Sequence, residues 1–167
     1  MIRIVDYDPG WPARFVREAA AIQAALGERV LGVEHVGSTS VPDLPAKPII
    51  DIVLMVADSA KEVEYAPALE AAGYKLHVRE PEWHEHRMFK SPGADVHLHV
   101  FSAGCPEIDR MLAFRDWLRV SASDRELYVK TKRELAQHAW KRMQDYADAK
   151  TPVIQQILAR MQNSQSR

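Results

Sequence analysis

Apolar residues recur at helical spacing in several parts of the chain. Positions 15, 19, 22 and 26 are spaced three or four residues apart and are followed by a glycine, which predicts a first helix. Ser-x-x-Glu patterns at 59–62 and 123–126 have the form of capping boxes and predict helices to Gly73 and to about residue 139. Helical spacing resumes after Pro106 and Pro152, so two more helices are expected to begin there.

The middle of the chain contains short β-prone runs separated by turn residues. Five such runs predict strands, at 30–36, 49–56, 74–78, 86–90 and 96–101. The second run is apolar except for Asp51, which predicts a central strand covered on both faces. The expected fold is α+β, a mixed sheet of about five strands packed with helices and followed by a helical C-terminal third. We expect one domain over residues 1–162 and a frayed tail over 163–167.

Composition narrows the class of protein. The 167 residues are 47% hydrophobic and 27% charged, which argues against disorder. Lys and Arg number 22 against 23 Asp and Glu, so no global basic field favours nucleic acid as a partner. Cys105 stands alone, and neither a leader nor a membrane-spanning run is visible, so we expect a cytoplasmic protein without a membrane partner. Nothing in the sequence indicates the oligomeric state.

A loop of small hydroxyl residues lies between the first two predicted strands. Gly37 lets a ligand approach the backbone amides, and successive amides in such a turn form an anion-binding nest. The hydroxyl donors that follow it are Ser38, Thr39 and Ser40. Lys47 adds a positive charge suited to a phosphate oxygen. The loop therefore indicates a phosphate-binding site, although the same residues would also make an ordinary turn.

Asp51 is a carboxylate in a strand that is otherwise apolar. Burying a carboxylate is unfavourable unless it is paired or binds a metal. One interpretation is a structural ion pair with Lys47 or Arg87. The other is a ligand site, in which Arg87 would lie beside Asp51 and contribute to phosphate binding. The residues alone leave both open.

Several segments together resemble the GrpB family. They are EHVGSTSVPDLPAKPIIDIVLMV at 34–56, HLHVF at 97–101, FRDWLR at 114–119, YVKTKRELA at 128–136 and DYADAKTPVI at 145–154. The resemblance covers nearly the whole chain and implies a fold of the nucleotidyltransferase superfamily, like the palm of DNA polymerase β. It also implies a nucleotide or another phosphorylated small molecule as partner. Domains of this family occur fused to dephospho-CoA kinases.

The resemblance assigns roles to particular positions. Gly37 and Ser38 match the superfamily's Gly-Ser pair, and Asp51 matches its first catalytic and metal-binding carboxylate. Lys132 and Lys150 match positions where the family tends to keep lysine, and either would reach toward a triphosphate. Active superfamily members usually carry Asp-x-Asp to hold two metal ions, whereas this chain has Val53 at the second position.

Two histidines stand where a further acidic residue is expected. His97 and His99 alternate along one strand and therefore share a face. With Asp51 they would form a metal site, for Mg²⁺ or Mn²⁺ ahead of Zn²⁺, with His99 as a catalytic partner of Asp51. The other interpretation is that both rings are hydrogen-bonded residues lining a polar groove.

Three hypotheses about function follow. The first is a metal-dependent nucleotidyltransferase with an incomplete Asp-x-Asp motif. The second is a non-catalytic nucleotide- or phosphate-binding module that assists a partner enzyme. A metal-dependent hydrolase that uses the histidines has less support. Dependence of turnover on divalent metal and on Asp51 separates the first from the second.

Overall fold

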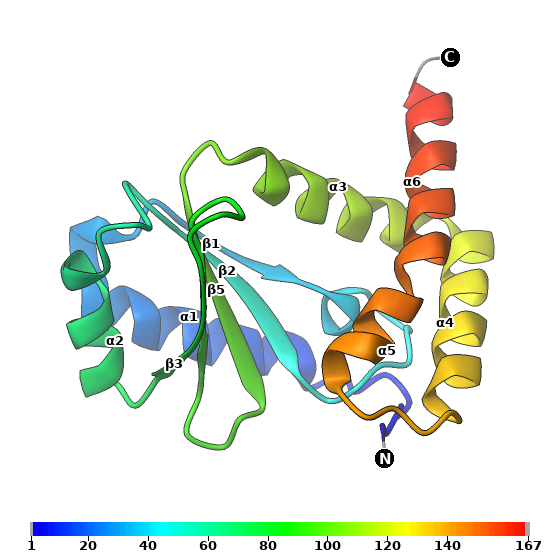
Figure 1. Cartoon of the computed structure of the whole chain (residues 1–167), viewed down its shortest axis with the longest axis horizontal. Coiled ribbons are helices and arrows are strands. Elements are labelled where there is room, and N and C mark those ends of the chain that lie inside the picture. The colour runs from blue at the N-terminus through cyan, green and yellow to red at the C-terminus, as the bar shows by residue number, and fades with distance from the viewer. Residues whose placement is uncertain (1, 166–167) are drawn as a thin grey trace.

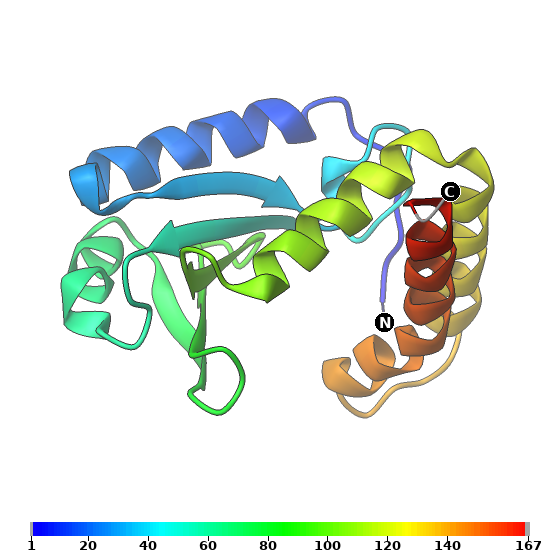
Figure 2. The ribbon, with the colours of Figure 1, turned by 90° about the horizontal axis from the view of Figure 1, so that it is seen from above.

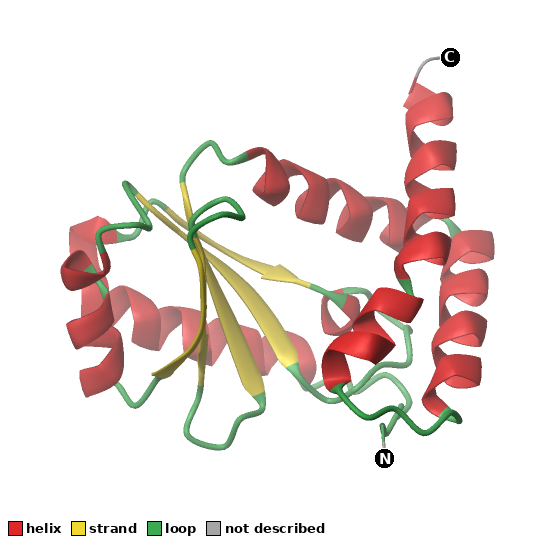
Figure 3. Ribbon diagram, in the orientation of Figure 1, coloured by secondary structure: helices red, strands yellow, loops and turns green. Residues whose placement is uncertain are grey.

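A computed structural model describes residues 2–165 of the chain. The strands are β1 (Gly32–Val36), β2 (Ile50–Val56), β3 (Lys75–Glu80), β4 (His86–Lys90) and β5 (Val96–Ser102). The helices are α1 (Trp11–Leu26), α2 (Ala66–Ala71), α3 (Pro106–Val120), α4 (Ala122–Ala136), α5 (Met143–Ala149) and α6 (Thr151–Gln165). The mixed sheet and the helical C-terminal third are confirmed, as Figure 3 shows.

The strands form one sheet in the order β1-β2-β5-β4-β3. β2 pairs with β1 antiparallel and with β5 parallel, so it has the internal position that its apolar run predicts. The parallel pairing aligns Asp51 with His97 and Val53 with His99. Because paired residues share a face of the sheet, these four side chains point to the same side.

Helices cover the two faces of the sheet unequally. On one face, α1 and α2 pack against a large core to which β2, β5 and β4 contribute Ile52, Leu98 and Phe89. On the other face, Ile108 of α3 packs against Val53 and Phe101. Figure 2 shows α1 on one side of the sheet and α3 crossing the other side. The part of the second face that carries Asp51 is left to the loop before β2 and the C-terminal helices.

The C-terminal helices form a separate packing unit beside the sheet (Figure 1). Tyr128 of α4 and Ile157 of α6 meet Val41 and Leu44 of the loop between β1 and β2 in one apolar cluster. Asp124, in the first turn of α4, accepts hydrogen bonds from Trp117 of α3 and Arg160 of α6. The unit is thereby joined both to the loop and to α3.

Both predicted capping boxes are wrong. Ser59 is buried, and its hydroxyl donates to the backbone oxygen of Glu85 rather than capping a helix. Glu62 lies in a short 3₁₀ turn, and α2 begins only afterwards, with a proline in its first turn. At the second site Ser121 is the N-cap, accepting from the backbone N–H of Asp124, two residues before the expected position.

Two other features of the C-terminal third differ from the expectation. α5 was not predicted, because its seven residues lack a long apolar stripe. α6 continues through Gln165, so residues 163–165 of the expected frayed tail are helical. The remaining two residues of that tail lie outside the described residues. In the described part of the chain, no helix is long and apolar enough to cross a membrane.

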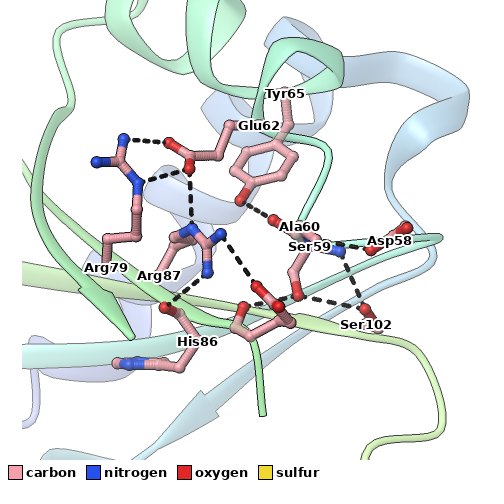
Figure 4. A network of polar contacts seen from close by, with 10 residues as sticks. Asp58, Ser59, Ala60, Glu62, Tyr65, Arg79, His86, Arg87 and Ser102 are labelled. Atoms are coloured by element: carbon pink, nitrogen blue, oxygen red, sulfur yellow. Dashed lines mark hydrogen bonds and ion pairs between the residues drawn. The ribbon is translucent and has the colours of Figure 1, made fainter. Parts of the chain in front are cut away.

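Arg87 lies in a polar network on the α1 and α2 side of the sheet. It pairs in register with Val100 and is only 3% exposed. Its guanidinium donates to Glu62 at 3.0 Å and to Glu85 at 3.1 Å, and Arg79 donates to the same Glu62 (Figure 4). Arg87 therefore faces away from Asp51. The expectation that it binds phosphate is wrong, since β4 turns its side chain to the opposite face.

This network should make stability depend on pH in acid. Hydrogen bonds from Arg79 and Arg87 lower the pKa of Glu62 to about 2, against the opposing effect of burial. A carboxylate with a lowered folded-state pKa stabilises the fold above its unfolded pKa, and that contribution is lost as pH falls. We expect Glu62→Gln to reduce the loss of unfolding free energy between pH 4.5 and pH 2, as measured by urea denaturation.

The control is Glu64→Gln, which changes an exposed carboxylate in the same 3₁₀ turn. This variant should follow the wild-type pH dependence. Equal slopes for Glu62→Gln and the wild type would show that the network does not hold the Glu62 carboxylate in its charged form.

Candidate functional site

A pocket of about 260 Å³ lies where the loop between β1 and β2 meets the C-terminal helices. The loop contributes Gly37, Ser38, Thr39 and Lys47 to its wall. From the sheet come Asp51 and His97, and from the helices come Tyr128, Lys132, Tyr146 and Lys150. The structure thus brings most of the sequence-predicted site residues into one place.

The loop is built so that its hydroxyl groups have different partners. Thr39 contacts His35 Nε2 at 2.9 Å and donates to the backbone oxygen of Ile49, so it ties the loop to both strands. Ser40 is buried and its hydroxyl donates to the carbonyl of Gly37. Ser38 instead accepts a hydrogen bond from a lysine at the pocket. Of the three predicted hydroxyl ligands, Ser40 is turned inward to hold the turn.

Gly37 allows the loop to approach the carboxylate of β2. Its backbone has φ +74° and ψ −177°, a conformation that is essentially restricted to glycine. A Cβ atom at this position would lie 2.6 Å from Asp51 Oδ2. Both constraints call for glycine, so the loop backbone lies directly against Asp51.

Three lysines converge on the pocket. Lys132 is 3% exposed and donates to Ser38 Oγ at 2.9 Å and to the backbone oxygen of Pro45 at 3.0 Å. Lys47 and Lys150 both lie over the ring of Tyr146, with Nζ 5.4 Å and 4.8 Å from the ring centroid. Such contacts stabilise an ammonium group without neutralising it.

Burial and mutual repulsion lower the pKa values of these lysines. Burial, then Lys150 and Lys47, lowers the pKa of Lys132 to about 7. Burial and the charge of Lys47 lower the pKa of Lys150 to about 8. Burial also lowers the pKa of Lys47, with Asp51 acting in the opposite direction. The folded protein therefore disfavours the charged forms of the lysines in this pocket.

The hydroxyl of Tyr146 has an unusual environment. Tyr146 is 1% exposed, lines the pocket and lies between two lysines. Its oxygen is the one buried side-chain N or O atom without a hydrogen-bond partner among the described residues. Buried polar groups in native proteins usually have partners, so the unpaired hydroxyl of a pocket-lining tyrosine is an exception to that rule. Sequence reasoning missed both this residue and Tyr128: both lie in segments that resemble the family, but no role was assigned to either tyrosine.

Asp51 contacts the two histidines of β5. Its Oδ1 lies 3.3 Å from His99 Nε2 and 3.8 Å from His97 Nδ1. Burial would raise the pKa of Asp51, but the hydrogen bond and charge of His99, with His97 and Lys47, lower it below the usual value. Within residues 2–165, no group of three or more His, Cys, Asp and Glu side chains is placed to hold a metal ion. The expected metal site at Asp51, His97 and His99 is therefore not preformed.

Two further residues, His86 and Glu80, position the His99 ring through its Nδ1 atom. Its Nδ1 lies 3.0 Å from His86 Nε2, and His86 Nδ1 lies 2.7 Å from Glu80 Oε1. His86 is buried, and desolvation lowers its pKa despite the hydrogen bond with Glu80. This chain fixes the plane of the His99 ring and leaves its Nε2 toward Asp51. His99 does not line the pocket itself, whereas His97 does.

The missing second carboxylate has a structural explanation. Val53 is fully buried and packs with Phe101 of β5 and Ile108 of α3. An apolar contact thus occupies the place where the second acidic residue of an Asp-x-Asp pair would stand. The site has one strand carboxylate, two adjacent imidazoles and three lysines.

The architecture defines the class of fold. Crystal structures of the poly(U) polymerase Cid1 superpose with a TM-score of 0.55 at 12% identity, covering 79% of this chain and 44% of that one. The GLD-2/RNP-8 complex gives a TM-score of 0.55 at 15% identity over 78% of this chain and 55% of that one. The chain therefore has a nucleotidyltransferase-like fold, and at these identities the likeness concerns the fold alone.

The family follows from closer matches. The family model described as GrpB protein matches residues 1–160, and the chain belongs to this family. The structure of conserved protein GrpB from Enterococcus faecalis superposes with a TM-score of 0.81 at 31% identity, covering 95% of this chain and 98% of that one. A UPF0157 protein of Halalkalibacterium halodurans is 59% identical over 159 residues, covering 95% of this chain and 82% of the relative.

A third relative shows the fusion that the resemblance implied. A dephospho-CoA kinase of Mycolicibacterium paratuberculosis is 33% identical over 178 residues, covering 90% of this chain and 44% of the kinase. The homologous region is therefore part of a longer protein in that organism.

Proposed function

We propose that the pocket binds a phosphorylated ligand, with a nucleotide as the best candidate. The observation that carries the proposal is the convergence of three lysines on one pocket beside the Gly37 loop. A phosphate group accepts hydrogen bonds from all of these donors and from backbone amides. The nucleotidyltransferase-like fold supports a nucleotide over free phosphate as the natural ligand.

Electrostatics favours an anion with more than one charge. Asp51 is the carboxylate that lines the pocket, against Lys47, Lys132 and Lys150. Burial first, and then repulsion from neighbouring lysines, lowers the pKa values of Lys132 and Lys150. A di- or triphosphate offers several negative oxygens to these three ammonium groups, and its binding relieves their repulsion.

We expect a divalent ion to bind together with the phosphates and not to occupy the site before them. Mg²⁺ in proteins is commonly held by one or two carboxylates together with substrate phosphates and water. Asp51 fits the role of the single protein carboxylate for Mg²⁺ or Mn²⁺, and it supplies no basis for a two-metal centre. When bound, such an ion would neutralise phosphate charge near Asp51.

Two functions use this binding site, and Asp51 distinguishes them. Nucleotidyl transfer is supported by the fold and by the 3.3 Å contact between Asp51 and His99, whose ring His86 and Glu80 hold in place. A non-catalytic module that assists a partner enzyme is supported by Val53, which fills the second carboxylate position with apolar packing. The kinase relative indicates one kind of partner.

Isothermal titration calorimetry tests the binding proposal directly. Tripolyphosphate and the four ribonucleoside triphosphates are titrated with and without Mg²⁺ or Mn²⁺, into the wild type and Asp51→Asn. We expect binding of polyphosphate ligands, with the metal-dependent part lost in Asp51→Asn. Absence of binding for every ligand would overturn the proposal, and metal-dependent turnover that disappears in Asp51→Asn would establish catalysis over binding alone.

The affinity for tripolyphosphate should fall as pH rises. Lys132, with a pKa of about 7, and Lys150, with a pKa of about 8, lose their protons over this range. Because an anion needs the ammonium forms, we expect affinity to decrease from pH 6.5 to pH 9 and binding near pH 8 to take up protons. Tripolyphosphate itself gains negative charge over the same interval, which alone would strengthen its binding. The decrease expected from the lysines therefore runs against the effect of the ligand's own ionisation.

Calorimetry in two buffers of different ionisation enthalpy measures the proton uptake. Lys150→Met removes one of the two groups and should reduce the uptake. Constant or rising affinity across the range would contradict the role assigned to these lysines.

A further inference from the structure

A second cavity adjoins the phosphate pocket. It has a volume of about 850 Å³ and lies between the N-terminal segment and the connection from α4 to α5. Its apolar wall is formed by Ile2, Ile4, Ala136, Trp140 and Met143. Figures 1 and 2 both show the N-terminal segment beside this connection. We call this cavity the Trp140 groove.

The Trp140 groove and the phosphate pocket share walls. Ile4 lines both cavities. Met143 of the groove is in contact with Lys47 of the pocket, Sδ to Nζ at 3.6 Å. The ring of Trp140 meets that of Tyr146 edge to face at 6.4 Å, so the aromatic wall of one cavity backs onto that of the other. A molecule anchored by its phosphates in the pocket therefore has the groove beside it.

The groove offers a flat ring held in place. Trp140 Nε1 donates a hydrogen bond of 2.6 Å to the backbone oxygen of Leu135, at the end of α4. This bond fixes the indole although the connection itself is not helical. Met143 is 57% exposed, an unusual degree for a methionine at the start of a helix, and its thioether adapts to varied partners.

We propose that the Trp140 groove binds the base and sugar of a nucleotide whose phosphates occupy the pocket. This inference rests on the proposed function and names the organic part of its ligand. The groove combines an aromatic wall with polar groups at its rim, Gln137, His138 and Arg142, as ligand-binding cavities commonly do. Stacking on an aromatic ring accepts any base, since every base has a π-face.

The test compares two ligands that differ only in the organic part. Affinities for tripolyphosphate and for the best-bound ribonucleoside triphosphate are measured by calorimetry. In the wild type we expect the nucleotide to bind about 5- to 150-fold more tightly, because its base stacks on an aromatic ring and tripolyphosphate has no base. Trp140→Ala should remove most of that difference and leave the affinity for tripolyphosphate within about twofold.

Two further variants sharpen the result. Trp83→Ala removes another partly exposed indole that lines neither cavity, and both affinities should stay at their wild-type values. Met143→Gln changes an exposed side chain of the groove, so it tests the same wall if Trp140→Ala fails to fold. Because Met143 also contacts Lys47, this variant should lower the affinity for the nucleotide more than the affinity for tripolyphosphate.

The outcomes separate the two proposals. If tripolyphosphate and nucleotide bind the wild type equally, or if both affinities fall together in Trp140→Ala and Met143→Gln, the groove does not bind the base and this inference is overturned while phosphate binding stands. If neither ligand binds the wild type, the proposed function fails and the groove inference fails with it.

Discussion

Replacing Lys132 with methionine is expected to abolish most polyphosphate binding while leaving the fold nearly as stable as before. Lys132 is the most buried of the three lysines and the one that reaches the Gly37 loop, through Ser38. A hydrogen bond to a charged group contributes about 1.5–3 kcal/mol, so affinity for tripolyphosphate should fall by roughly 10- to 150-fold. Calorimetry measures this loss.

Stability should change little because two effects oppose each other. Lys132→Met removes two hydrogen bonds, each worth about 0.5–1.5 kcal/mol. It also removes a buried charge whose lowered pKa, about 7, shows that the folded state disfavours the ammonium form. We expect the free energy of unfolding at pH 7 to change by no more than about 2 kcal/mol.

The pH dependence gives an independent check. A lysine with a lowered folded-state pKa makes the wild type more stable as pH rises from about 7 toward 10.5, and the rise should be smaller in the methionine variant, which keeps only the contributions of Lys150 and Lys47. Lys130→Met changes an exposed lysine of the same helix and should alter neither binding nor this slope. Unchanged affinity in Lys132→Met would remove this lysine from the site.

Gly37→Ala is expected to destabilise the protein and to displace Asp51. The backbone conformation at position 37 costs a residue with a side chain about 1–3 kcal/mol. The new Cβ would also lie 2.6 Å from Asp51 Oδ2, and overpacking of this kind costs about 1–3 kcal/mol more. We therefore expect a loss of about 2–6 kcal/mol in urea denaturation. Metal-dependent ligand binding should be lost as well, because Asp51 has to move.

Gly27→Ala is the matched control. Gly27 also has a positive φ, of 58°, but nothing lies within 4 Å of a Cβ built on it. Gly27→Ala therefore measures only the cost of the backbone conformation. The difference in unfolding free energy between the two variants then gives the cost of the contact with Asp51. Equal losses of unfolding free energy in the two variants would mean that the Asp51 side chain moves away from the new methyl group without an energetic cost.

Much of the fold was predictable because it depends on local patterns. The apolar run around Asp51 predicted a central strand, and β2 lies between β1 and β5. The first helix and the helices that begin near Pro106 and Thr151 follow from apolar spacing and proline position. The second capping box failed because Ser121 caps α4 two residues earlier. The first failed because tertiary contacts use its residues. Ser59 is drawn into hydrogen bonds with Glu85 and Ser102 instead.

The site was predictable only in part. Residues that the family motif marks, such as Ser38, Lys132 and Lys150, do line one pocket or hold its wall. Arg87 was misplaced because alternation along a strand gives two faces without telling which one meets Asp51. Tyr146 lies on a short helix that periodicity does not reveal, and its significance is a missing hydrogen bond, which only packing can show.

The packing of Val53 limits how a second metal-binding carboxylate could be engineered into this chain. An aspartate placed there would put an unpaired carboxylate between Phe101 and Ile108, where burial of a charge is strongly unfavourable. Building a paired-carboxylate centre at this position therefore requires changes in Phe101 of β5 and Ile108 of α3 together with the change at Val53. Val53 thus couples the metal chemistry open to Asp51 to the packing of α3 on the sheet.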